Sequence, residues 1–131
     1  MQQNKTRTTE KDFQIFKDEV YKYLRLYQLE GAWDIYFAHC DGNKEDELAT
    51  TSVDIEAMCV TFRLYKDWSQ HIPGPSIEEV KATARHEVRH LLLMRVHMMA
   101  CQRNLDVDKL NGEIHSIIHC IEMVERKLKG S

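Results

Sequence analysis

The chain has 131 residues, a formal net charge of −3 and a hydrophobic content of 43%. This length suits one domain with a single core, and the slight negative charge argues against non-specific nucleic-acid binding, which needs a basic surface. No apolar run approaches the roughly 20 residues of a membrane-spanning helix, and the polar N-terminus is unlike a signal peptide. We therefore expect a cytoplasmic protein with neither a nucleic-acid nor a membrane partner.

The first part of the chain predicts a short lead and one helix. Residues 1–8 are expected to be disordered, with a single domain over residues 9–131. A helix is predicted from about Glu10 to Leu29, ended by Gly31. Its buried face should carry the apolar residues that recur at helical spacing, namely Phe13, Phe16, Val20, Leu24 and Tyr27.

Three short strands are predicted next. Trp33, Ile35 and Phe37 alternate with polar or small residues, which is typical of a half-buried strand. Two more strands are expected near Ala49–Asp54 and Cys59–Tyr65, after a solvated acidic loop at 44–47. The four cysteines are widely spaced, with no C-x-x-C pair, so we expect free, buried thiols; they are Cys40, Cys59, Cys101 and Cys120.

Two long helices complete the prediction. Ser76 and Glu79 form a capping box behind a Pro-Gly-Pro stop, and a helix should run from Ile77 to about Arg103. Its apolar stripe comprises Ala84, Val88, Leu91, Leu92, Val96 and Met99. The last helix begins between about Asp106 and Asn111, with the stripe Leu110, Ile114, Ile117, Ile121, Val124 and Leu128. The order of elements predicts an α+β fold: a small antiparallel three-stranded sheet packed with helices.

The motif H-E-x-x-H stands at residues 86–90, inside the second predicted helix. One helical turn separates His86 from His90, so both imidazoles project from one face and can bind a single zinc ion. Glu87 lies beside that face, where it can reach a metal-bound water without being a ligand. The motif predicts a zinc site in which Glu87 is the catalytic base.

A catalytic zinc site needs a third protein ligand. The last helix offers Glu113, His115, His119 and Glu122. At 100° per residue, Glu113 lies about 80° from the centre of the apolar stripe, and His115 lies about 120° from it. Because the ligand must face the motif helix, we predict Glu113 as the third ligand, with His115 as the alternative.

With these residues the chain resembles the compact zincin-like metallopeptidases of bacteriophages and prophages, which are gluzincin-type proteins. The resemblance spans roughly residues 12–128, and its specific part is the H-E-x-x-H core. The family's last helix reads approximately E-E-H-x-I-I-x-x-L-E, against E-I-H-S-I-I-H-C-I-E at residues 113–122 here, so Ile114 replaces the second Glu. The resemblance implies a minimal zincin-like fold and leaves the substrate open.

We therefore predict a zinc-dependent hydrolase that cleaves peptide bonds in a peptide or protein substrate. One alternative is a zincin-fold protein that binds without turnover, such as a phage factor acting on a host protein in the host cytoplasm. The others are a hydrolase of a non-peptide amide, which uses the same zinc-water chemistry, and an ordinary helical protein with a chance motif. A site of two histidines and a glutamate also accepts iron, cobalt or nickel. The sequence makes no prediction about cleavage specificity or oligomeric state.

Overall fold

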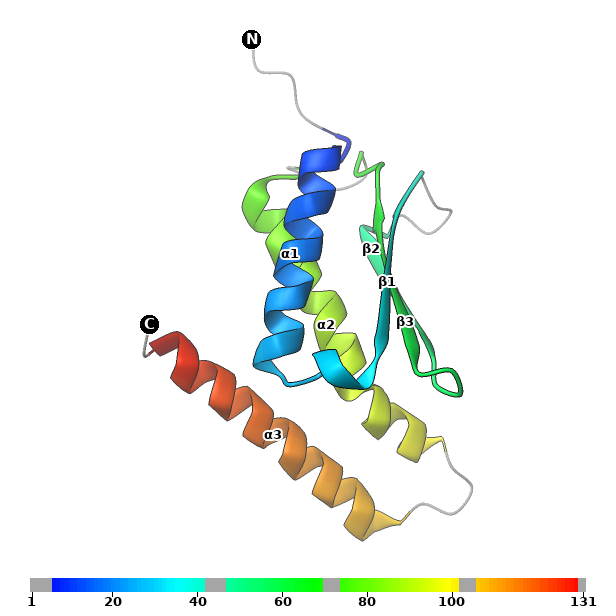
Figure 1. The fold of residues 1–131 in the computed structure, drawn as a ribbon, viewed down its shortest axis with the longest axis vertical. Helices are drawn as coiled ribbons and strands as arrows, with labels where there is room; N and C mark the ends of the chain where they lie inside the picture. The colour runs from blue at the N-terminus through cyan, green and yellow to red at the C-terminus, as the bar shows by residue number, and fades with distance from the viewer. Residues whose placement is uncertain (1–5, 42–46, 70–73, 102–105, 130–131) are drawn as a thin grey trace.

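The computed structural model describes residues 6–41, 47–69, 74–101 and 106–129 (Figure 1). The elements in chain order are α1 (Glu10–Leu26), the short 3-10 helix η1 (Glu30–Ala32), β1 (Asp34–Cys40), β2 (Ala49–Asp54), β3 (Cys59–Tyr65), α2 (Ile77–Ala100) and α3 (Val107–Lys129). Helices α1 and α2 lie side by side against one face of the sheet, and α3 crosses beneath them (Figure 1). The predicted α+β fold is confirmed. No helix within the described ranges is long and apolar enough to span a membrane.

The sheet has the order β1-β3-β2, so β1 and β2 are its two edges. Strands β2 and β3 form an antiparallel hairpin, with Thr51 opposite Phe62. Strand β1 is parallel to β3, with Ile35 opposite Val60, so the expected antiparallel sheet is in fact mixed. The chain passes from β1 to the far edge and returns through the hairpin to the middle, which makes the first and third strands run the same way.

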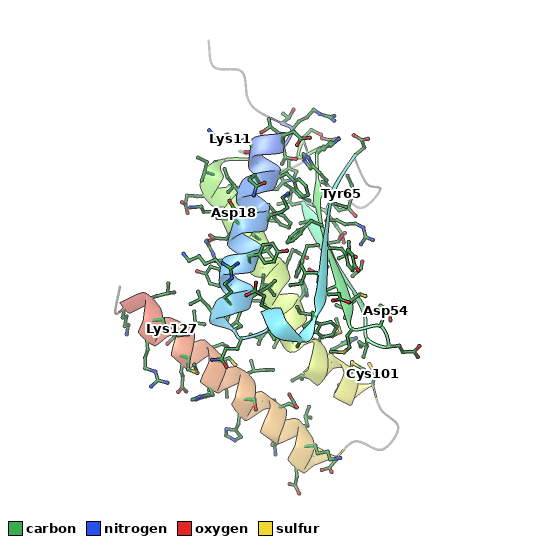
Figure 2. The ribbon with its side chains drawn as sticks, in the orientation of Figure 1. Lys11, Asp18, Asp54, Tyr65, Cys101 and Lys127 are labelled. Atoms are coloured by element: carbon green, nitrogen blue, oxygen red, sulfur yellow. The ribbon has the colours of Figure 1, made fainter. Side chains whose placement is uncertain are left out.

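The core lies between the sheet and the two helices that cover it, where side chains from both layers meet (Figure 2). Strand β3 alternates as predicted, because Val60, Phe62 and Leu64 are fully buried. They pack with Phe16, Val20 and Leu24 of α1, Val80, Ala84 and Val88 of α2, and Trp68. Burial of each larger side chain stabilises the fold by about 1.5–3 kcal/mol. The core therefore fixes α2 against the sheet.

Helix α1 ends three residues earlier than predicted. Gln28, not Gly31, takes the left-handed conformation, with φ of 60°. The amide of Leu29 donates to the carbonyl of Leu24 at 2.8 Å, and the amide of Gln28 donates to Arg25 at 3.0 Å. These two bonds form a Schellman ending, which satisfies the last carbonyls of the helix without glycine.

Helix α2 begins as predicted. The amide of Glu79 donates to Ser76 Oγ at 3.2 Å, and Gly74, with φ of 93°, turns the chain into the helix. In the predicted stripe Ala84, Val88, Leu91 and Leu92 are buried and Val96 is half-buried. The side chain of Met99, and the predicted end near Arg103, lie outside what the structure describes.

Two further predictions need correction. Thr6 and Thr8, expected in a disordered lead, pair with the segment after β3: the amide of Thr8 donates to the carbonyl of Lys66, and that of Trp68 donates to Thr6, both at 2.8 Å. The thiols are free as predicted, but none is buried: Cys40, Cys59 and Cys120 are half-buried and Cys101 is exposed. Residues 1–5 and 42–46, which include most of the acidic loop predicted at 44–47, lie outside the described ranges.

Candidate metal centre

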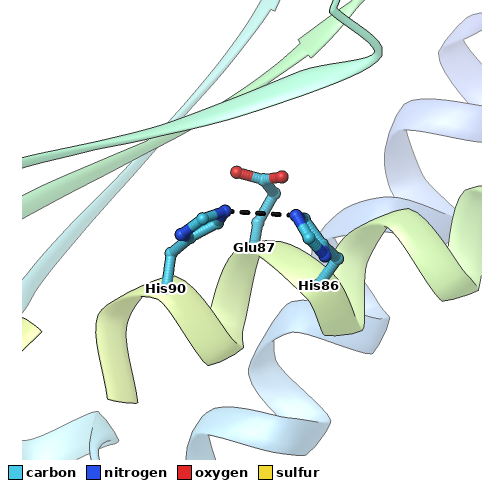
Figure 3. A group of neighbouring side chains, drawn as sticks. All are labelled: His86, Glu87 and His90. Carbon is cyan, nitrogen blue, oxygen red and sulfur yellow. Dashed lines mark hydrogen bonds between the residues drawn. The ribbon is translucent and has the colours of Figure 1, made fainter. Parts of the chain in front are cut away.

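The two motif histidines lie on the solvent-facing side of α2, one turn apart. Both side chains are exposed, as their position opposite the apolar stripe predicts. His86 Nε2 and His90 Nε2 are 3.1 Å apart (Figure 3), and the ring centroids are 4.7 Å apart with the rings nearly perpendicular. The helix therefore brings two imidazole nitrogens to one point.

Glu87 differs from its neighbours because it is buried, with 5% of its surface exposed. Thr51 of strand β2 holds its carboxylate: Thr51 Oγ1 donates to Glu87 Oε1 at 2.7 Å and lies 3.1 Å from the backbone oxygen of Glu87. One ligand-capable atom from each of His86, Glu87 and His90 lies within 4.8 Å of the other two. Within the described ranges this is the one group of three or more such residues close enough to share a metal ion.

The cluster opens onto a groove between α2 and edge strand β2, with a volume of about 640 Å³. One wall comes from the start of β2 and the residues before it, and the other from one face of α2. The lining residues are Glu47, Leu48, Ala49, Thr50, Thr51, Ala82, Thr83, His86, Glu87, His90 and Met94. Small side chains line both walls of the groove beside the histidines, namely Ala49, Thr50, Thr51, Ala82 and Thr83.

The residue before the motif fixes α2 on its other side. Arg85 Nη1 donates to Glu19 Oε2 of α1 at 3.0 Å, in an ion pair whose Glu19 side chain is buried. The Arg85 guanidinium also lies over the ring of Tyr23, 5.9 Å from its centroid. These contacts hold α2 to α1 one residue away from the first histidine.

The spacing of the histidine nitrogens suits a metal ion. Two nitrogens each about 2.05 Å from a tetrahedral zinc lie about 3.3 Å apart, and the nitrogens of His86 and His90 are 3.1 Å apart. Borderline nitrogen ligands of this kind are those that zinc prefers. Without a metal, the same separation is that of a hydrogen bond between two neutral imidazoles.

The structure does not bring Glu113 to this cluster. Helix α3 packs on a different side of α2, along a second groove lined by Tyr23, Tyr27, Arg89, Leu92, Leu93, Ile121, Val124, Glu125 and Leu128. Leu92 lies about 140° around α2 from the midpoint of the two histidines. Glu113, His115, His119 and Glu122 stand on α3, and none of them joins the metal-capable group. A third ligand at Glu113, or at His115, stays a prediction.

Sequence reasoning missed the wall opposite the histidines. Thr51 contacts Glu87 across 36 residues of sequence. Nothing in the sequence around Thr51 indicates this contact. It depends on the order in which the strands pair, which could not be predicted. The structure thus adds a residue that binds the motif's glutamate.

Comparisons with known proteins add nothing to this geometry. No family model, no curated protein and no solved structure matches the chain. The resemblance to zincin-like metallopeptidases therefore depends on the residues of the chain itself.

Proposed function

We propose that the groove between α2 and β2 is the active site of a zinc-dependent hydrolase that cleaves peptide bonds. The observation that supports this most is the pair of imidazole nitrogens 3.1 Å apart beside a buried carboxylate, all facing the groove. His86 and His90 would hold the metal; Glu113, the third ligand predicted from the sequence, does not lie with them among the described residues, so its part in the site is left to the zinc analysis below. A location in the cytoplasm is part of the same proposal.

Each residue of the motif has a distinct task in this proposal. When bound, zinc supplies a Lewis acid that activates water and polarises the scissile carbonyl. Glu87 accepts the proton of the attacking water and passes it to the leaving amine. Burial of Glu87 under β2 and its bond to Thr51 keep the carboxylate beside the histidines. The proton transfer from water to Glu87 would therefore take place in the groove, beside His86 and His90.

The substrate would be an extended peptide or protein segment. Strand β2 is a sheet edge and forms one wall of the groove. An edge strand presents unpaired backbone groups that an incoming chain can pair with. Peptide bound along β2 would lie over the histidine pair.

The test is zinc analysis of protein purified without chelator or affinity metal, followed by cleavage of a fluorogenic peptide library. We expect about one zinc per chain, lost in His86→Ala. Zinc lost in Glu113→Ala as well would identify Glu113 as the third ligand. The Glu87→Gln variant should keep its zinc and lose at least about 100-fold in turnover. Zinc lost in His86→Ala but kept in Glu113→Ala would move the third ligand to His115. Protein that takes up no zinc would overturn the proposal.

A zincin-like protein that binds a partner without turnover is the second candidate. It is favoured by the fact that, among the described residues, no third ligand from another element joins the histidine pair. For such a protein, wild type and Glu87→Gln would bind a peptide with equal affinity, and neither form would cleave it. A difference in turnover between the two forms would exclude this candidate.

A further inference from the structure

Thr51 stands on β2 with its side chain toward α2. It pairs in register with Phe62, which is fully buried in the core, so both side chains lie on the helix-facing side of the hairpin. Threonine is β-branched and has few rotamers in a strand. Its hydroxyl is therefore held in one direction, toward the motif helix.

The hydroxyl meets two oxygens of the same residue. Thr51 Oγ1 lies 2.7 Å from Glu87 Oε1 and 3.1 Å from the Glu87 backbone oxygen. A hydroxyl has one hydrogen to donate, and the shorter contact, to a carboxylate, is the stronger one. One carboxylate oxygen of Glu87 is thereby bound to β2, which restricts rotation of the carboxylate beside the groove that Glu87 lines.

We infer that Thr51 is a positioning residue for Glu87: its hydroxyl orients the carboxylate so that the second oxygen meets the water at the histidine pair. This inference depends on the proposed hydrolase function. The geometry of a proton transfer tolerates little error, since displacement of a reacting group by about 1 Å can lower a rate 100-fold. A side chain that sets the carboxylate direction therefore acts on turnover more than on substrate binding.

The location of Thr51 gives the contact a further consequence. The backbone of β2 is the proposed docking edge for the peptide, and the Thr51 side chain holds the base. A peptide that pairs with the backbone of β2 would therefore bind to the same strand whose Thr51 side chain orients Glu87.

The variants that test this are Thr51→Val, which keeps the shape and removes the hydroxyl, and Thr51→Ser, which keeps the hydroxyl. The matched control is Ser52→Ala, because Ser52 is the next residue of β2 and its Oγ contacts Arg63 Nη1 at 2.6 Å on the opposite face of the sheet. Each protein is loaded with zinc, checked for folding by circular dichroism, and assayed on the peptide that wild type cleaves fastest in the library. If Thr51→Val does not fold, Thr51→Ala replaces it.

We expect kcat to fall about 10- to 100-fold in Thr51→Val with KM within about two-fold of wild type. Thr51→Ser and Ser52→Ala should stay within about three-fold of wild type in kcat, and all four proteins should bind equal zinc. A merely structural role would instead lower stability or zinc content and leave kcat of the folded protein unchanged.

A second readout does not depend on turnover. The infrared carboxylate stretch of Glu87 is the band that disappears in Glu87→Gln, and it should shift in Thr51→Val but not in Thr51→Ser or Ser52→Ala. If wild type is active and Thr51→Val is equally active, this inference is overturned and the proposed hydrolase function is not. Zinc-loaded wild type that cleaves no peptide would overturn the proposed function, and the inference with it.

Discussion

Two buried carboxylates, Glu19 and Glu87, are compensated in different ways. Glu19 and Glu87 expose 6% and 5% of their surfaces. Glu19 forms an ion pair with Arg85 at 3.0 Å between α1 and α2. Glu87 accepts a hydrogen bond from the neutral hydroxyl of Thr51 and faces the groove. The same burial thus accompanies a full countercharge in one place and a neutral donor in the other.

The difference separates a structural carboxylate from one suited to chemistry. A buried charge that is paired holds two elements together, and its neutralisation leaves the partner unpaired. A buried carboxylate held by a hydroxyl keeps its orientation without being bound to a cation. Arg85 and Glu87 are two residues apart on α2, so one helix presents both arrangements on opposite sides.

The largest expected effect on stability is at Glu19. Glu19→Gln should lower the free energy of unfolding by about 2 to 3 kcal/mol, because Arg85 is left with its charge unpaired. The Arg85 side chain is 26% exposed, so water offsets part of the cost. Urea unfolding followed by circular dichroism measures the change.

The matched control is the exposed pair between Arg25 and Glu30, which has the same separation of 3.0 Å but side chains 65% and 41% exposed. Glu30→Gln should cost less than about 0.5 kcal/mol. Equal losses in Glu19→Gln and Glu30→Gln would mean that the buried pair does not hold α1 to α2, and the contrast with Glu87 would disappear.

A half-buried histidine extends the comparison to acid pH. His39 on β1 has Nε2 2.7 Å from Thr8 Oγ1, whose own hydrogen is donated to the carbonyl of Tyr65. The ring stacks on Phe13 at 4.8 Å, and its Nδ1 is buried without a hydrogen-bond partner. Like Glu87, His39 is held by a threonine hydroxyl.

Burial, together with the charge of Lys66, lowers the pKa of His39 below 6.5, although Glu10, Asp12 and Asp41 act in the opposite direction. The unfolded chain therefore binds more protons than the folded one just below pH 6.5. We expect the free energy of unfolding to fall as the pH drops through 6.5, and to level off below the folded-state pKa. Urea unfolding between pH 8 and pH 5 follows this change.

The matched variant is His39→Gln, whose amide can donate to Thr8 without titrating. Since the other histidines are common to both proteins, the difference in acid sensitivity isolates His39. If the free energy of unfolding falls by the same amount at acid pH in His39→Gln as in wild type, the effect comes from other groups and His39 is excluded as its source.

These contacts also mark how much the sequence could predict. Helix α2 with its Ser76 cap, strand β3 and the histidine pair follow from residues a few positions apart, and the structure has them as expected. The bonds of Thr51 to Glu87 and Thr8 to His39 join residues 36 and 31 positions apart. They depend on which strand pairs with which, and no local pattern encodes that.

Helix α3 shows the same limit for the predicted ligand. The predicted stripe of α3 was correct in Ile117 and Val124, which are buried, and wrong in Ile114, Ile121 and Leu128, which are exposed. Periodicity identifies the buried face of one helix and is silent on which side of α2 that face meets. Because α3 packs along Arg89 and Leu92, it does not bring Glu113 to the histidines.

A smaller change of opposite sign is expected at Gly112. This glycine lies within α3, and a Cβ added there would meet nothing within 4 Å. Gly112→Ala should raise the free energy of unfolding by about 0.5–1 kcal/mol, because alanine loses less backbone freedom in a helix. Less stable variants can then be measured in the Gly112→Ala protein. A loss of stability by urea unfolding would show that α3 is not helical at this position in solution.

The smallest expected effect on stability is at Glu87, where the effect on turnover is largest. In Glu87→Gln the amide oxygen can still accept from Thr51, and the contacts described for Glu87 include no cation that would be left unpaired. We expect unfolding free energies within about 0.5 kcal/mol of wild type or slightly higher, because a buried charge is removed at little cost in hydrogen bonding. Urea unfolding of Glu87→Gln beside Glu19→Gln measures both sites on one scale. A loss as large as that of Glu19→Gln would mean that Glu87 has a countercharge and serves the fold. Stability kept while turnover is lost is the combination expected of a residue whose charge serves the reaction.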